Sequence, residues 1–213
     1  FQNIITWSNP SHKRGMAPRV IHLTAGIRQS YTEISLHNSK QTFTQYIPFA
    51  GIDFTPFQSA TLSGQAEYVI GDYNEQDFLI SATLLTILGK REKNLGTTRI
   101  NLTIRSEQPG YFFSQYKGNF NQWNNSWNKT GIISTSFTYQ YKFLESGVSL
   151  NRVQNFVYLD TLLLPQQSSK EFAYLQVYAK TNVDLWKFRI ISHLVYHTVQ
   201  GTNILNFQRS TFV

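Results

Sequence analysis

The chain contains no cysteine. It therefore has no disulfide framework, no thiolate nucleophile and no cysteine-bound metal site. Charged residues are also scarce, at 15% of the sequence, against roughly 25% in typical soluble domains. Ser, Thr, Asn and Gln supply most of the polar surface instead. This composition is typical of β-sheet proteins that work outside cells or inside large assemblies.

Catalytic signatures are missing as well. The sequence has no Gly-x-Ser-x-Gly motif, no phosphate-binding glycine loop and no dinucleotide fingerprint. A β-sandwich glycosidase would need two facing carboxylates. The candidates lie in no recognisable local pattern: they are Asp53, Glu67, Asp160 and Glu171. We therefore expect a protein that is not an enzyme and that binds no cofactor.

Two clusters of possible metal ligands are weak. The acidic segment 72–77 starts with the spacing of an EF-hand loop, but Asp77 stands where that loop needs glycine and Thr83 where it needs glutamate. A solvated turn is the favoured interpretation. His193 and His197 would share a helix face, but on a strand their spacing separates them by about 13 Å. The sequence therefore predicts no metal site.

The clearest positive signal is an alternating segment from Ile133 to Phe143. Its odd positions are mostly large and apolar or aromatic, and its even positions are polar. Successive side chains of a β-strand point to opposite faces, so this pattern predicts a half-buried strand. Gly131 and Gly147 provide turn residues on either side. We expect this strand to be central to the fold.

Similar alternation recurs along the chain. Proline cannot donate to a β-ladder, so Pro48 and Pro56 predict an edge or a loop. Segment 78–88 fits neither helix nor strand periodicity cleanly, and we interpret it as a buried strand. A change of phase near Ile190–Ile191 predicts a β-bulge inside one long strand. The other predicted strands cover 20–27, 31–36, 42–49, 65–70, 99–105, 154–164, 172–180, 185–199 and 204–207.

The predicted fold class is all-β. Eight to eleven strands with few helix signals favour an antiparallel β-sandwich that resembles a jelly roll. Residues 1–18 contain Asn9-Pro10 and a Lys-Arg-Gly cluster, and they predict an extended N-terminal arm. Residues 19–213 are expected to form a single β-sandwich domain.

Aromatic residues gather in an Asn-rich segment. Trp123 and Trp127 lie between Gly118 and Gly131, in a composition that favours a loop. Exposed rings there would contact a sugar, a partner subunit or a membrane interface. The alternative is that they fold back onto the core of the domain itself. The candidate contact and glycan-binding residues are Tyr116, Phe120, Trp123 and Trp127, and the sequons at Asn101, Asn124 and Asn128 matter only in a eukaryotic secretory pathway.

The formal charge of +7 is spread along the chain rather than gathered in a polybasic arm. Lys90, Arg91 and Lys93 form a basic hairpin that is a candidate contact for the phosphates of a nucleic acid. A charged edge that prevents sheet-to-sheet aggregation is the favoured interpretation.

Three function classes fit these features. We favour a structural subunit of a larger assembly, such as a viral capsid, spike or phage virion protein, with copies of itself or other subunits as partners and a virion or extracellular location. The second class is a secreted or surface carbohydrate-binding module or adhesin that uses loop 118–131 for host attachment to a glycan or receptor. The third is a membrane-inserting β-barrel or pore former. Amphipathic strands allow it, but a lipid-facing band would need longer uninterrupted alternation than the sequence shows.

Overall fold

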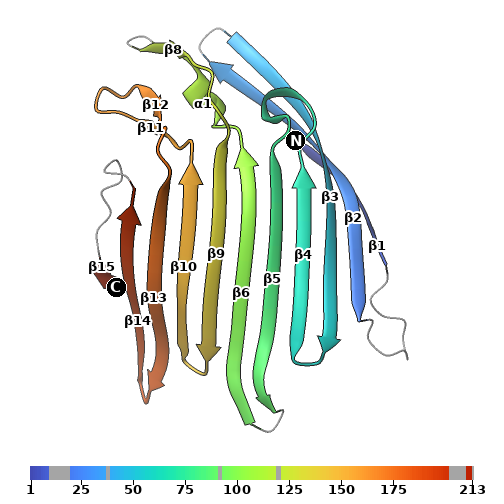
Figure 1. Ribbon diagram of the computed structural model, residues 1–213, viewed down its shortest axis with the longest axis vertical. Coiled ribbons are helices and arrows are strands. Elements are labelled where there is room, and N and C mark those ends of the chain that lie inside the picture. The colour runs from blue at the N-terminus through green and yellow to red at the C-terminus, as the bar shows by residue number, and fades with distance from the viewer. Residues whose placement is uncertain (10–19, 37–38, 91–92, 119–120, 202–209, 213) are drawn as a thin grey trace.

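Eleven of the strands form one large antiparallel sheet (Figure 1). The computed structural model describes residues 1–9, 20–36, 39–90, 93–118, 121–201 and 210–212. In sheet order the strands are β1 (Gln2–Ser8), β2 (Ile21–Leu36), β3 (Ser39–Phe57), β4 (Ala60–Tyr68), β5 (Phe78–Lys90), β6 (Lys93–Glu107), β9 (Thr130–Tyr141), β10 (Leu144–Gln154), β13 (Phe172–Leu185), β14 (Phe188–Gln200) and β15 (Ser210–Phe212). The predicted all-β antiparallel class is confirmed.

Smaller elements lie between these strands. Two short hairpins pair β7 (Gln115–Lys117) with β8 (Gln122–Asn124), and β11 (Val157–Leu159) with β12 (Pro165–Gln167). The connection before β5 contains the 3-10 turn η1 (Asp72–Asn74), and the connection after β6 contains the one-turn helix α1 (Tyr111–Ser114). None of the helices in the described part of the chain is long and apolar enough to cross a membrane.

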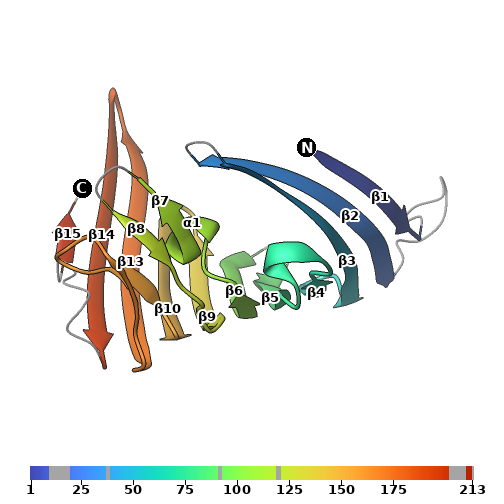
Figure 2. The ribbon, with the colours of Figure 1, turned by 90° about the horizontal axis from the view of Figure 1, so that it is seen from above.

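The arrangement of the strands differs from the expected sandwich. The strands of the large sheet follow one another in chain order, as a meander. Figure 2 shows them as one curved layer rather than two packed sheets. A jelly roll needs two sheets and strands that cross between them. Alternation identifies strands with two different faces, but it does not say what covers each face.

Several strands are longer than the sequence patterns indicated. β2 joins two predicted segments, and β3 runs through both prolines. The ladder between β3 and β4 ends at the Phe49–Glu67 pair, next to Pro48, and Pro56 lies in a register shift between Phe54 and Phe57. Each proline, which has no N–H to donate, therefore lies where the β3–β4 ladder is interrupted. The prediction of an edge or a loop is wrong, because β3 lies between β2 and β4 inside the sheet.

Two further predictions can be compared with the structure near the N-terminus and at β5. Segment 78–88 lies within β5, so its assignment as a strand is confirmed, but the strand is not buried, since Ile80 and Ile87 are 50% and 45% exposed. The extended arm was expected over residues 1–18. Gln2–Ser8 forms β1 and pairs with β2, whereas residues 10–19 lie outside the described part of the chain.

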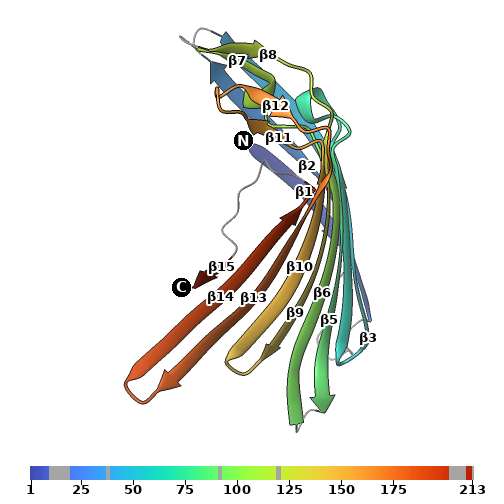
Figure 3. The same cartoon turned by 60° about the vertical axis from the view of Figure 1, so that its left-hand side comes forward.

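The two ends of the sheet carry different connections. At one end, β3–β4, β5–β6, β9–β10 and β13–β14 are each joined by two residues. At the opposite end the chain makes the longer connections 69–77, 108–129 and 155–171, which contain η1, α1 and both small hairpins. Figure 3 shows these connections gathered at one end of the strands. The first two connections of the chain are the exceptions, since β1 and β2 are joined by twelve residues at the end with the short turns, and β2 and β3 by two residues at the opposite end.

The conventional hydrophobic core is very small. Among the described residues, the buried apolar side chains are those of Ile47, Val153, Val157, Phe172 and Val195. A soluble domain of this size normally buries most of its large apolar side chains. The stability of this sheet therefore depends on its backbone ladders and on whatever medium covers its apolar surface.

Candidate functional site

One face of the sheet is an exposed apolar surface. Cross-strand partners lie on the same face, and one such row runs through Leu84, Ile100, Phe137, Val148 and Val177. Large side chains on this face, here called the apolar face, stay exposed from β1 to β14: Ile5, Trp7, Leu23, Ile27, Ile52, Leu62, Ile80, Leu84, Ile100, Leu102, Phe137, Val148, Leu150, Val177, Leu194 and Tyr196. Soluble proteins rarely expose contiguous apolar patches above a few hundred Å². This face therefore needs an apolar environment.

Charged side chains on the apolar face lie toward the end with the long connections. They are Glu33, Lys40 and Arg152 among the described side chains. Lys40 pairs with Glu33 at 2.8 Å, and Arg152 pairs with Glu171. The middle of the face is left uncharged.

The opposite face, here called the polar face, is lined with hydroxyl and amide groups. Thr83 donates to the Asn101 side-chain oxygen at 2.9 Å, and the Asn101 amide donates to Ser136 at 3.0 Å. Ser134 donates to Asn151 at 2.6 Å. Neighbouring side chains on this face thus meet part of their hydrogen-bonding capacity with each other. Their remaining donors and acceptors are directed away from the sheet.

The polar face is the concave one. Figure 2 shows α1 within the curve of the sheet. Tyr111 of α1 donates to Gln41 of β3, and its ring centroid lies 5.2 Å from that of Phe43. Gln41 and Phe43 share the face of Phe49 by the alternation along β3. The long connections thus fold over the polar face, and burial raises the pKa of the Tyr111 hydroxyl.

Charges on the polar face balance one another. Arg28 forms an ion pair with Glu67 at 2.8 Å, and Asp53 accepts from Ser63 at 2.6 Å. His22 lies 3.5 Å from the Asp53 carboxylate. The described strand side chains of this face include as many basic as acidic groups. The basic ones are Arg28, Arg99, Arg105, Lys180 and Arg189, and the acidic ones are Asp53, Glu67, Glu107, Glu145 and Asp184. The surface is therefore polar without a strong preference for one sign of charge.

The predicted aromatic contact residues pack against one another. The rings of Tyr116 and Trp123 are stacked at 4.6 Å, and Phe112 meets Trp123 edge-on at 5.4 Å. The indole N–H of Trp123 donates to the Phe112 carbonyl, and that of Trp127 to the Phe113 carbonyl, both at 2.8 Å. The structure thus stacks two of the four, Tyr116 and Trp123, on the β7–β8 hairpin, and it ties Trp127 to α1 through the Phe113 carbonyl. Phe120 lies outside the described residues. Contact of this cluster with a glycan or a partner stays a prediction.

Only the backbone of Lys90 and Lys93 in the basic hairpin belongs to the described part of the chain. Lys90 ends β5 and Lys93 begins β6. Arg91 lies outside the described residues, and the side chains of Lys90 and Lys93 do so too. Its contact with phosphate groups stays a prediction.

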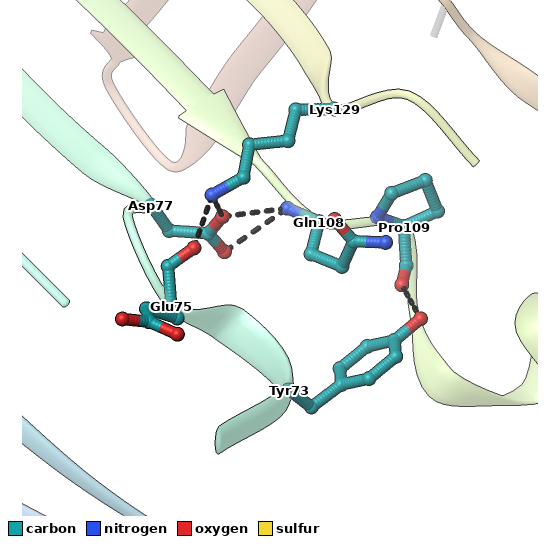
Figure 4. Close-up of polar contacts among 6 residues, drawn as sticks. All are labelled: Tyr73, Glu75, Asp77, Gln108, Pro109 and Lys129. Atoms are coloured by element: carbon teal, nitrogen blue, oxygen red, sulfur yellow. Dashed lines mark hydrogen bonds and ion pairs between the residues drawn. The ribbon is translucent and has the colours of Figure 1, made fainter. Parts of the chain in front are cut away.

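The acidic segment contains a buried network that the sequence did not indicate. Asp77 was expected in a solvated turn, but it is only 6% exposed. Figure 4 shows its carboxylate accepting the Gln108 backbone N–H at 2.9 and 3.0 Å and pairing with Lys129 at 2.8 Å. Lys129 also donates to the Glu75 carbonyl, and the Tyr73 hydroxyl donates to the Pro109 carbonyl at 2.6 Å. The segment therefore fastens the connection 69–77 to both ends of the connection 108–129.

Metal ligands do not gather in the described part of the chain. No group of three or more His, Asp or Glu residues there could hold an ion. His193 and His197 lie on β14, where they pair with Lys180 and Gln176 respectively.

Comparison with known proteins gives one match. A family described as "Putative porin" matches residues 16–207, which is 192 of the 213 residues. No curated protein and no solved structure matches the chain. Because this is a family of non-enzymatic channels, the match confirms the expectation that the protein is not an enzyme.

The match overturns the favoured sequence-based function. The interpretation as a virion, capsid or host-attachment protein is wrong, and so is the virion or extracellular location, since a porin implies an outer membrane. The secreted carbohydrate-binding module is not supported either, whereas the membrane hypothesis agrees with the match. With nine-tenths of its residues matched, the chain belongs to this porin family.

Proposed function

We propose that this sheet forms part of the wall of an outer-membrane pore through which small hydrophilic solutes pass. The observation that carries the proposal is the opposition of its two faces. The convex face exposes Ile100, Phe137 and Leu150, while the concave face carries Asn101, Ser136 and Asn151. In a membrane pore the first face contacts lipid and the second contacts water.

The strands have the length that such a wall needs. A tilted β-strand crosses a bilayer with about 9–11 residues. β5, β6, β9, β10, β13 and β14 contain 13, 15, 12, 11, 14 and 13 residues. Each therefore spans the hydrocarbon region, and the longer ones extend into an interface.

The two kinds of connection give an orientation. Outer-membrane proteins have short turns toward the periplasm and long loops toward the outside. The two-residue turns after β3, β5, β9 and β13 would then face the periplasm, and the turn between β2 and β3 would face the outside. Phe143 and Trp186 in these turns are 56% and 87% exposed, as in the aromatic girdles at membrane interfaces.

The open edges of the sheet require further strands. β1 and β15 each have one neighbour among the described strands. A strand edge in lipid would leave its N–H and C=O groups without hydrogen bonds, which costs several kcal/mol per group. We infer that both edges pair with additional strands that complete the wall of the pore.

Single cysteines can test the pore, because the native sequence contains none. Thr103→Cys places a thiol on the polar face, and Leu102→Cys places one on the apolar face of the same strand. The protein is inserted into planar bilayers and exposed to a charged, membrane-impermeant thiol reagent. We expect stepwise conductance, which the reagent lowers in Thr103→Cys and leaves unchanged in Leu102→Cys. Absence of conductance, or equal modification of both thiols, would contradict the proposal.

A further inference from the structure

Gly51 differs from two other glycines of the polar face. A Cβ at Gly26 would stand 2.6 Å from Phe49 Cζ, and one at Gly147 would stand 2.6 Å from Tyr178 Cε1. Those two positions need glycine because an aromatic ring and a backbone carbonyl oxygen, that of Ile5 at Gly26 and that of Phe137 at Gly147, lie close to each. At Gly51 the nearest atoms to a Cβ would be Gly64 O at 3.6 Å and a Thr24 carbon at 3.9 Å, which is ordinary van der Waals contact. Packing of the sheet therefore does not require a glycine at this position.

Glycine inside a strand lowers stability and often marks a place where a ligand comes close to the backbone. Gly51 lies at the floor of a depression of about 340 Å³. Ligand sites in proteins start at about 300 Å³. The depression is thus large enough for one small solute about the size of a single ring.

The walls of the depression come from four neighbouring strands, β2 to β5. Thr24, Gln65 and Ser81 share the row of Gly51. The adjacent row contributes Asp53, Ser63 and Thr83. All six side chains lie on the polar face and line the depression.

The chemistry of these walls fits a neutral solute rich in hydroxyl groups. Hydroxyl and amide side chains can both donate and accept hydrogen bonds, and a carboxylate can accept two. Asp53 is 54% exposed, so its oxygens have lone pairs to spare beyond the hydrogen bond from Ser63. Its charge is faced by His22 at 3.5 Å. The nearby Arg28 is paired with Glu67 at 2.8 Å, and Glu67 also accepts from Gln65, which leaves no unpaired positive charge among the described residues here for an anionic solute.

We propose that the depression at Gly51 is a subsite that retains a small neutral polyhydroxylated solute, such as a free monosaccharide or a sugar alcohol, on its way through the pore. Gly51 provides the space, Asp53 accepts two hydroxyls of the solute, and the surrounding hydroxyl and amide groups complete its hydrogen bonds. This inference rests on the proposed pore, because the polar face must be open to the solute.

The test measures glucose binding to the full chain in detergent micelles, by saturation-transfer NMR with titration. Gly51→Val narrows the depression at a position where a Cβ meets the backbone only at ordinary contact distance, and we expect it to weaken glucose binding at least about tenfold. Asp53→Asn removes charge-assisted hydrogen bonds and is expected to weaken binding by about ten- to hundredfold. The controls are Ala82→Val, on the apolar face of β5, and Glu145→Gln, a polar-face carboxylate on β10. Both controls should bind like the native protein.

The outcomes separate the subsite from the pore. Unchanged affinity in Gly51→Val or Asp53→Asn, equal losses in the controls, or no saturable binding by the native protein would overturn the subsite. If Gly51→Val fails to fold, Asp53→Asn alone decides the question. Bilayer conductance of the same samples is the independent measurement. Conductance without glucose binding removes the subsite and keeps the pore. Binding without conductance removes the pore, and with it the passage of the solute, and leaves only a glucose site on the polar face.

Discussion

Lys129 lies 2.8 Å from the Asp77 carboxylate, and this ion pair joins the start of β5 to the segment that leads into β9. The same carboxylate receives the backbone N–H of Gln108, at the end of β6 (Figure 4). Three segments distant in sequence therefore converge on one buried side chain. The long connections are held over the polar face from this point.

Replacement of Asp77 by alanine should destabilise the protein by about 3 kcal/mol, because it leaves a partly buried ammonium and a backbone donor without their acceptor. Urea unfolding in micelles measures the loss. Asp184→Ala is the control, since the Asp184–Arg189 pair is 67% and 62% exposed and such pairs contribute at most about 1 kcal/mol. Equal effects of the two variants would show that Asp77 does not fasten the connections.

A second prediction concerns Tyr178, whose ring covers Gly147 on the neighbouring strand. The Tyr178 hydroxyl donates to Glu145 at 3.1 Å, which fixes the ring in place. Gly147→Ala should therefore cost about 1–3 kcal/mol by overpacking. Gly51→Ala, with open space above it, should be neutral or stabilise by about 0.5 kcal/mol.

Combining Gly147→Ala with Tyr178→Ala tests the cause of that cost. Removal of the ring should recover part of the loss, so the double variant should be less destabilised than the sum of the two single variants. The free energy of unfolding is measured for all four proteins of the cycle. Strict additivity would show that the ring does not oppose the added methyl group.

Acid should loosen the connection 155–171, which lies outside the proposed membrane-spanning strands. The backbone N–H of Leu164, followed by that of Leu162 and the Gln166 amide, lowers the pKa of the Asp160 carboxyl. A lowered pKa means that the stabilisation is present above the ordinary Asp value of about 3.9 and is lost as the pH falls through the lower folded-state value. Amide exchange at Leu162 and Leu164 should accelerate only at that lower pH. Asp160→Asn should remove the pH dependence, and a persistent transition in that variant would assign it to another group.

The strands were largely predictable from alternation, but the tight turns were not. Lys142 and Trp186 adopt φ values of 50° and 53° in two-residue turns. Such conformations usually use Gly, Asn or Asp, so neither place carries a recognisable turn signal. The predicted bulge near Ile190–Ile191 is wrong, because β13 and β14 pair in one unbroken register from the turn to the far end of both strands. The change of phase marked the hairpin at residues 186–187.

The environment of the two faces was the harder question. Alternating residues such as those of β9 fit a sandwich core and a lipid-facing wall equally well, because period two reports only that the faces differ. The lengths of β2 and β3, at 16 and 19 residues, would have favoured a wall. Pro48 and Pro56 hid the length of β3, and the polar residues 28–30 divided β2 into two predicted segments. Asp77 gave no local signal, since its partners Gln108 and Lys129 are distant in sequence.

The adjacent residues Ser149 and Leu150 on β10 test the assignment of the faces, since Ser149 lies on the polar face and Leu150, 50% exposed, on the apolar face. Arginine on the lipid face near the bilayer midplane costs about 2–4 kcal/mol, whereas Ser149→Arg extends into water. Leu150→Arg should therefore destabilise the protein folded in phosphatidylcholine vesicles by about that amount, as measured by urea titration. Ser149→Arg should change the free energy of unfolding by less than about 1 kcal/mol. In buffer without lipid or detergent the two variants should be equally stable, because water then contacts both faces. If the two variants differ equally with and without lipid, protein rather than lipid covers the apolar face. If Ser149→Arg is the more damaging variant in vesicles, the assignment of the two faces is reversed.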